Sequence, residues 1–113
     1  MLVIDSDKVK AQKVQMEGVK DTTIQILINH PPASTFIMRK FRIKPGGYTP
    51  LHAHAYEHEV YVLEGLGEVR NEKQSIQIRQ GSVVFIPPNE VHQFRNVGEV
   101  DLVFLCLIPA KSL

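Results

Sequence analysis

The sequence has little of several features that mark particular classes of protein. Cys106 is its single cysteine, so an intrachain disulfide is excluded and a reducing cytoplasm is the expected location. The 13 basic and 12 acidic residues nearly cancel to a net charge of +1, and no nucleic-acid partner is expected. The longest apolar run, 102–109, is far shorter than the about 20 residues that span a bilayer, and the first residues lack a signal-peptide pattern. We therefore expect a near-neutral cytoplasmic domain with no membrane partner.

What is present is a series of short β-type runs. The length of 113 residues suits one domain, and apolar residues recur with a period of two between Pro- and Gly-containing turns. This pattern predicts an all-β sandwich or barrel without a convincing helix. The expected strands are residues 23–29, 36–43, 51–54, 57–63, 68–71, 75–79, 82–86, 91–96 and 101–108, with an edge strand over 9–14.

The turns between these runs predict how neighbouring strands connect. Residues 68–71 and 75–79 are expected to form a hairpin, and 91–96 is expected to pair with 101–108 across the turn 97–99. The Pro-Gly-Gly sequence at 45–47 is expected to break the chain after the second strand.

Three histidines crowd into one segment. Its pattern is Gly46-x5-His52-x-His54-x3-His58-x6-Gly65. Residues i and i+2 of an extended strand project to the same face, so His52 and His54 are expected to point the same way. His58 has the same parity, and a turn through residues 55–57 would return it to the same pocket.

A fourth histidine stands in a second segment. Its pattern is Gly81-x5-Pro87-x-Asn89-x2-His92-x3-Asn96. A lone strand histidine is more often a hydrogen-bonded residue than a ligand, but His92 together with the first three predicts a site for one divalent transition metal. His30 has no such partners and is interpreted as a surface residue.

Both segments resemble the two sequence motifs of the cupin superfamily, over about 46–65 and 81–96. The resemblance implies a double-stranded β-helix, the cupin jelly-roll barrel, as a single domain over residues 1–113. That fold agrees with the strand count reached from the periodicity.

Two positions depart from the family pattern. The family's glutamate falls on His58, and its second-motif glycine falls on Asn89, a residue that tolerates a left-handed turn. If the local register shifts by one, Glu57 or Glu59 takes the ligand role instead. Carried over by motif position, the metal ligands implied by the resemblance are His52, His54, His58 and His92.

The ligand set and the tail 104–109 look like those of small bacterial manganese-type cupins. Manganese is therefore the favoured ion, with iron, nickel, zinc and copper as alternatives. Four ligands on an ion that prefers six leave two positions open for oxygen ligands. An all-imidazole shell leaves the full 2+ charge on the ion, which favours Lewis-acid polarisation of a bound oxygen.

Strand parity also indicates which side chains line the pocket. Phe94 shares the parity of His92, and Phe104, Cys106 and Ile108 share one face of the last strand. Cys106 is either a small buried apolar residue or a reactive thiol near the metal. Arg39 either holds a substrate carboxylate or is a surface charge.

Three functions remain open at this point. The favoured one is a metal-dependent oxidoreductase of dioxygenase type that acts on a small apolar or phenolic molecule. The second is an isomerase or lyase that polarises a carbonyl, for which Glu57, Glu59 and Tyr61 are the candidate bases. The third is a non-catalytic module that binds a small ligand, because the fold alone does not decide the function.

A second copy of the chain is the expected cover for exposed strand edges and apolar surface. We predict a homodimer in solution at micromolar concentration, since a domain this small buries its sheet edges poorly by itself. Light scattering coupled to gel filtration should give a mass of twice the 12.8 kDa of the chain. A monodisperse species at the mass of one chain would contradict this prediction.

Overall fold

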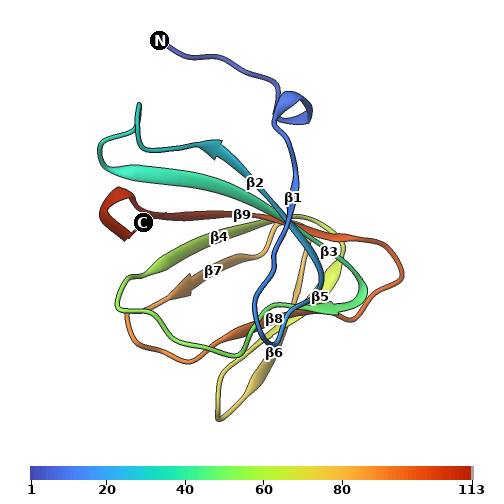
Figure 1. Ribbon diagram of the computed structural model, residues 1–113. Helices are drawn as coiled ribbons and strands as arrows, with labels where there is room; N and C mark the ends of the chain where they lie inside the picture. Colours follow the sequence, from blue (N-terminus) through green and yellow to red (C-terminus); the bar gives the residue numbers. More distant parts are fainter. Residues whose placement is uncertain (113) are drawn as a thin grey trace.

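The computed structural model describes residues 1–112, which form nine strands (Figure 1). The strands are β1 (Gln12–Lys13), β2 (Lys20–Ile28), β3 (Phe36–Tyr48), β4 (His58–Glu64), β5 (Leu66–Arg70), β6 (Ser75–Arg79), β7 (Val83–Ile86), β8 (Gln93–Asn96) and β9 (Leu102–Pro109). Two short 3-10 turns, η1 (Ser6–Lys8) and η2 (Ala110–Ser112), flank them. Within this described part of the chain, no helix has the length and apolarity needed to cross a membrane.

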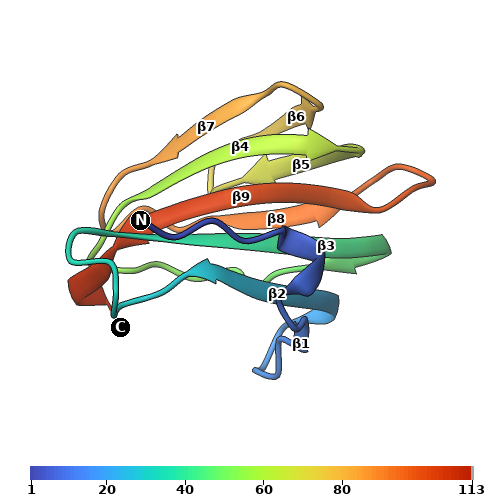
Figure 2. The ribbon, with the colours of Figure 1, turned by 90° about the horizontal axis from the view of Figure 1, so that it is seen from above.

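All strands belong to one antiparallel sheet that curls on itself. Its order is β6-β5-β8-β3-β9-β4-β7, with β2 also paired to β3 and β1 paired to β2. Viewed from above, β7, β4, β9, β3 and β2 lie side by side, and β8, β5 and β6 fold behind them (Figure 2). The all-β jelly-roll architecture expected from the sequence is confirmed.

The core lies on the concave side of this curled sheet, and its residues follow the period-two pattern. On β4, His58, Val60 and Val62 are buried, whereas Glu59 and Tyr61 between them are exposed. Four alternate side chains of β9 are likewise buried: Leu102, Phe104, Cys106 and Ile108. Alternation along β4 and most of β9 therefore sends one set of side chains to the interior, and Val103 on the other face of β9 is buried as well.

Two local expectations need correction. The Pro-Gly-Gly sequence does not break β3, because Gly46 takes a left-handed φ of +81° and the strand continues to Tyr48. A Cβ at Gly47 would lie 2.6 Å from the backbone oxygen of Lys20, so the pairing of β2 with β3 needs glycine there. The expected strand over 51–54 is reduced to one bridge between His52 and His92.

Of the two expected hairpins, one is confirmed and one is wrong. β5 pairs with β6 as predicted. β8, however, pairs with β5 and β3, while β9 pairs with β3 and β4. The end of β3 lies between them, so residues 97–101 are a crossover rather than a hairpin turn. Period-two patterning cannot distinguish these connections, because both have the same alternation. The expected edge strand over 9–14 is present only as β1.

The side chain of Asn96 holds this crossover in place. It is buried, and its amide donates to the backbone oxygens of Ile43 and Val100, each at 2.8 Å. Its side-chain oxygen accepts from the backbone nitrogen of Gly98 at 2.8 Å. One buried amide therefore satisfies three backbone groups at the point where the chain leaves β8.

We predict that Asn96→Ala lowers the free energy of unfolding by about 2–3 kcal/mol, because buried backbone groups lose their partners. Asn71→Ala is the matched control, since the Asn71 side chain accepts from two backbone nitrogens in an exposed turn. That variant should lose under about 1 kcal/mol, because water replaces the bonds. Urea unfolding followed by circular dichroism measures both values, and equal losses would contradict the structural role of Asn96.

Candidate metal centre

The two histidine-bearing segments meet through their backbones. His52 and His54 lie in the connection between β3 and β4, His58 is the first residue of β4, and His92 directly precedes β8. The His52 nitrogen donates to the His92 oxygen at 3.1 Å, and the His92 nitrogen donates to the His52 oxygen at 2.9 Å. This reciprocal pair fixes residues 40 positions apart side by side.

Three of the four rings form a compact nitrogen cluster. One ring nitrogen from each of His52, His54 and His92 lies within 4.8 Å of the others. The ring of His54 is 4.1 Å from that of His52 and 5.4 Å from that of His92, between centroids. The Nδ1 atom of His92 lies 2.9 Å from the Glu90 backbone oxygen, so Nε2 is its free nitrogen. These three residues can hold one metal ion.

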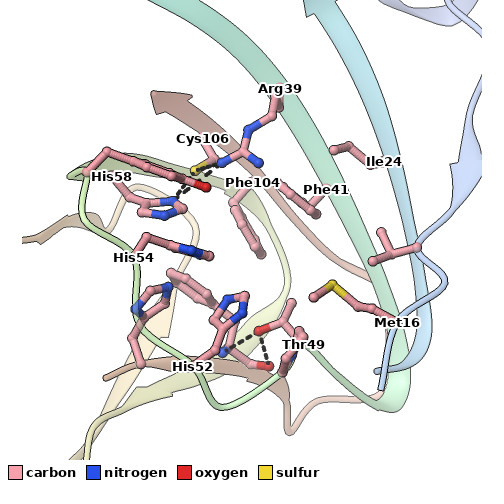
Figure 3. A pocket seen from close by; sticks show the side chains of 15 residues that line it. Met16, Ile24, Arg39, Phe41, Thr49, His52, His54, His58, Phe104 and Cys106 are labelled. Carbon is pink, nitrogen blue, oxygen red and sulfur yellow. Dashed lines mark hydrogen bonds between the residues drawn. The ribbon is translucent and has the colours of Figure 1, made fainter. Parts of the chain in front are cut away.

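His58 lies beside this cluster but has a different set of contacts. Its ring centroid is 5.0 Å from those of both His54 and His92. Its Nδ1 atom lies 3.0 Å from Cys106 Sγ and 3.4 Å from an Arg39 guanidinium nitrogen (Figure 3). Its Nε2 atom is buried and has no hydrogen-bond partner. The close nitrogen cluster thus contains three of the four histidines implied by the resemblance, with His58 at its side.

The surroundings keep all four imidazoles neutral near pH 7. Burial is the main cause of the lowered pKa of His54, about 4, and of His58, about 3. Burial also lowers the pKa values of His52 and His92, although the Glu90 carbonyl partly offsets the effect at His92. Neutral imidazole is the form that coordinates a metal, so the donor set suits a divalent transition ion.

The unpartnered Nε2 of His58 supports the same assignment. A buried polar atom with no partner costs free energy, and such atoms are rare in folded proteins. A metal ion that accepts this lone pair would remove that cost. Two features therefore fit a metal ion at this site. The donors are neutral imidazole nitrogens, and the Nε2 atom of His58 is buried without a partner.

The histidines line a cavity of about 330 Å³ whose other walls are mostly apolar. Phe94 stacks on Phe104 with a centroid separation of 4.6 Å, and Phe104 stacks on Phe41 at 5.4 Å. The remaining lining side chains are Val14, Met16, Ile24, Arg39, Thr49, Pro50, Tyr56 and Cys106. This is a small pocket by the usual range of about 300–1,000 Å³.

The structure separates the pocket residues expected from the sequence into two groups. Arg39, Phe94, Phe104 and Cys106 line the cavity. Ile108 instead lies in the core at 2% exposure and is not among the lining side chains, because β9 carries it past the end of the cavity. Burial raises the pKa of the Cys106 thiol.

The acidic and phenolic candidates near His58 lie elsewhere. Glu57, Glu59 and Tyr61 are exposed and do not line the cavity, because β4 starts at His58 with this histidine facing inward. None of them lies in the cavity beside the histidines, so none is placed to act as a base there. The alternative in which a one-residue register shift makes Glu57 or Glu59 the ligand is therefore wrong.

Sequence reasoning missed several lining residues. Tyr56 stacks on His54 at 4.7 Å between centroids with an interplanar angle of 7°. Thr49 bonds the backbone of Phe94 and so ties the end of β3 to β8. Met16 lies across the cavity from Arg39 (Figure 3). Parity on the strand over 23–29 would have indicated Ile24, but no sequence signal places the 14–16 segment over the cavity.

The jelly-roll sheet and the histidine cluster define a class, a small β-barrel whose interior histidines could hold a metal ion. The cupin domain model matches residues 39–108, and the chain belongs to the cupin family. That match includes the histidines and the walls of the cavity on β3, β8 and β9.

Known proteins similar to this chain have diverse activities. The structure of the polyketide cyclase RemF from Streptomyces resistomycificus is 34% identical, has a TM-score of 0.91, and is matched over 97% of this chain and 80% of its own. An uncharacterised protein of Methanocaldococcus jannaschii is 27% identical over 94% of this chain and 88% of its own length. The oxalate-binding protein of Thermotoga maritima is 33% identical over 64% of this chain, and the match spans only 60% of that protein.

The lowered histidine pKa values predict how the metal-free protein responds to acid. The pKa of His54 falls from 6.5 to about 4 on folding, so the folded state binds fewer protons than the unfolded state between these values. Stability should therefore be constant above about pH 6.5 and decline as the pH falls from 6.5 towards 4. Urea unfolding at a series of pH values, after dialysis against a chelator, measures this decline.

Two variants show whether the decline comes from the cluster. His54→Gln should have a shallower pH dependence, because one of the four groups that resist protonation is gone. His30→Gln, in the turn between β2 and β3, should behave like the original protein. An identical acid response in all three proteins would contradict the assignment.

Proposed function

We propose that this protein is a metal-dependent cupin enzyme that acts on the carbonyl or enol oxygen of a small, aromatic or otherwise apolar substrate. The observation that carries the proposal is the position of the histidine cluster in a cavity of about 330 Å³ lined by Phe41, Phe94 and Phe104. Such a cavity selects a small molecule with an apolar body and offers few polar anchors.

One divalent ion per chain is the proposed cofactor. His52, His54 and His92 would hold it, and His58 is the proposed fourth ligand through the unpartnered Nε2. The donors are neutral nitrogens, which manganese, iron, nickel, zinc and copper accept, and manganese is the ion that the family resemblance favours. When bound, the ion would polarise the oxygen of a ligand and acidify its neighbouring C–H or O–H bond.

The chain's own residues would orient the substrate and exclude water. The stacked rings of Phe94 and Phe104 form an apolar wall beside His92. Aspartate and glutamate are absent from the described lining of the cavity, so a proton released there would pass to water rather than to a carboxylate. This arrangement supports carbonyl chemistry that is driven by an electrophile more than by a carboxylate base.

Similarity to the polyketide cyclase RemF supports the same substrate class. A polyketone carries several carbonyl groups and becomes aromatic on cyclisation, which matches a cavity with aromatic walls and an electrophilic centre. We infer a substrate with at least one aromatic ring or ring precursor next to a carbonyl.

A second candidate function is the dioxygenase predicted from the sequence. The apolar walls that surround the histidines favour it, because dioxygen and phenolic substrates both partition into such a cavity. This reaction would consume oxygen, whereas the carbonyl chemistry would proceed without it. A non-catalytic ligand-binding module would do neither.

We predict that the metal-loaded protein exchanges the methyl hydrogens of 1-phenylpropane-1,2-dione with solvent deuterium under anaerobic conditions. The exchange, followed by proton NMR, should fall at least about tenfold after chelation or in His54→Ala, because the metal ligand is lost. His30→Ala should keep the full rate, and elemental analysis should find one metal ion per chain in both His30→Ala and the original protein.

Parallel measurements in air distinguish the three functions. Oxygen uptake with diketones or phenols across the manganese, iron and copper forms would favour the dioxygenase. A tightly bound ligand recovered unchanged, with neither exchange nor oxygen uptake, would favour a binding module. The absence of stoichiometric metal would overturn the proposal in all its forms.

A further inference from the structure

Arg39 is an unusual residue for the position it occupies. It lies on β3 and is the only charged residue, apart from the titratable histidines, in the described lining of the cavity. Its guanidinium carbon lies 5.0 Å from the centroid of the Phe41 ring, and one terminal nitrogen donates to Cys106 Sγ at 3.0 Å. Its Nε atom is buried and has no hydrogen-bond partner. The positive charge therefore faces the cavity.

No carboxylate compensates this charge among residues 1–112. The two ion pairs found there join Arg42 to Asp101 and Arg95 to Glu68, both away from the cavity. The sulfur of Cys106 is a weak acceptor, and the ring of Phe41 offers only a modest cation–π attraction. A half-buried guanidinium with a buried Nε and no counter-charge loses part of its hydration, so its place in the cavity favours a partner that the described chain does not supply.

Arg39 also lies next to the histidine cluster. The same terminal nitrogen that reaches Cys106 is 3.4 Å from Nδ1 of His58. Figure 3 shows Arg39, Cys106 and His58 together on one side of the cavity, with Met16 opposite. A ligand whose oxygen faces the histidines would thus bring a neighbouring anionic group to the guanidinium.

We propose that the cavity binds an anionic ligand, a carboxylate on a small apolar or aromatic body, and that Arg39 is the residue that selects the negative charge. This inference rests on the proposed function in one respect, the placing of a second ligand oxygen at the metal. Recognition of the carboxylate itself depends on Arg39 alone. Guanidinium geometry suits a carboxylate because two parallel N–H groups can donate to its two oxygens.

The volume limits the size of this ligand. A cavity of about 330 Å³ holds little more than one aromatic ring and a short acidic side chain. The aromatic walls of Phe94 and Phe104 would pack against the body while its acidic end points towards β3 and β9, where Arg39 and Cys106 lie. A simple 2-oxo acid with one phenyl ring combines these features.

Benzoylformate and its methyl ester form a matched pair of probes, because they differ in the charge of one group. Isothermal titration calorimetry of the metal-loaded protein should show at least about tenfold tighter binding of the acid than of the ester. This ratio corresponds to a difference of about 1.4 kcal/mol in binding free energy. Arg39→Gln should lose this preference, while Arg39→Lys should keep part of it, because the charge is retained without the planar fork.

Arg42→Gln is the matched control. Arg42 is three positions along the same strand, exposed and paired with Asp101, so this variant should bind both probes like the original protein. Circular dichroism and metal content, measured on each variant, show whether Arg39→Gln is folded and loaded. If that variant does not fold, the preference retained by Arg39→Lys and the salt dependence of acid binding carry the test.

The same titrations on metal-free protein separate this inference from the proposed function. A preference for the acid that survives metal removal and disappears in Arg39→Gln supports the role of Arg39, even if no metal-dependent activity is found. Equal affinities for acid and ester in the original protein would overturn it. An undiminished preference in a folded Arg39→Gln would do the same.

Discussion

The site depends on two backbone hydrogen bonds between His52 and His92. They join the connection before β4 to the start of β8 and set the distance between two segments that are far apart in the sequence. Because these bonds use main-chain atoms, the imidazoles remain free to present their nitrogens to one another. Thr49 reinforces the junction through its bonds to Phe94, so the cluster is held by the sheet itself.

The cavity combines neutral donors with one uncompensated cation. Burial keeps the histidines deprotonated, with a pKa of about 3 at His58, and Arg39 beside it favours the neutral form further. A bound divalent ion would add to the positive potential that Arg39 already creates. Neutral histidine ligands would leave the charge of a bound ion undiminished, and Arg39 adds a second positive charge. Both would raise the affinity of the cavity for an electron-rich oxygen of a ligand.

Much of the fold was predictable because alternation along a strand is a local property. The β5–β6 hairpin and the inward faces of β4 and β9 follow from residues such as Val60, Val62 and Phe104. The pairing partners of β8 and β9 did not follow, since alternation says which face is buried and not which strand lies alongside. Gly46 and Gly47 were read as a break for a similar reason, although the structure uses them to continue β3.

The sequence by itself determined the class of fold and which four histidines are the candidate ligands. Both follow from the spacing and alternation of residues that are close together in the chain. Only the tertiary structure decided which nitrogens meet. It placed His58 against Cys106 and Arg39, moved Glu57 and Glu59 to the outside, and left Ile108 in the core. The reason is that contacts across a curled sheet depend on strand order and twist, which join residues that no local pattern connects.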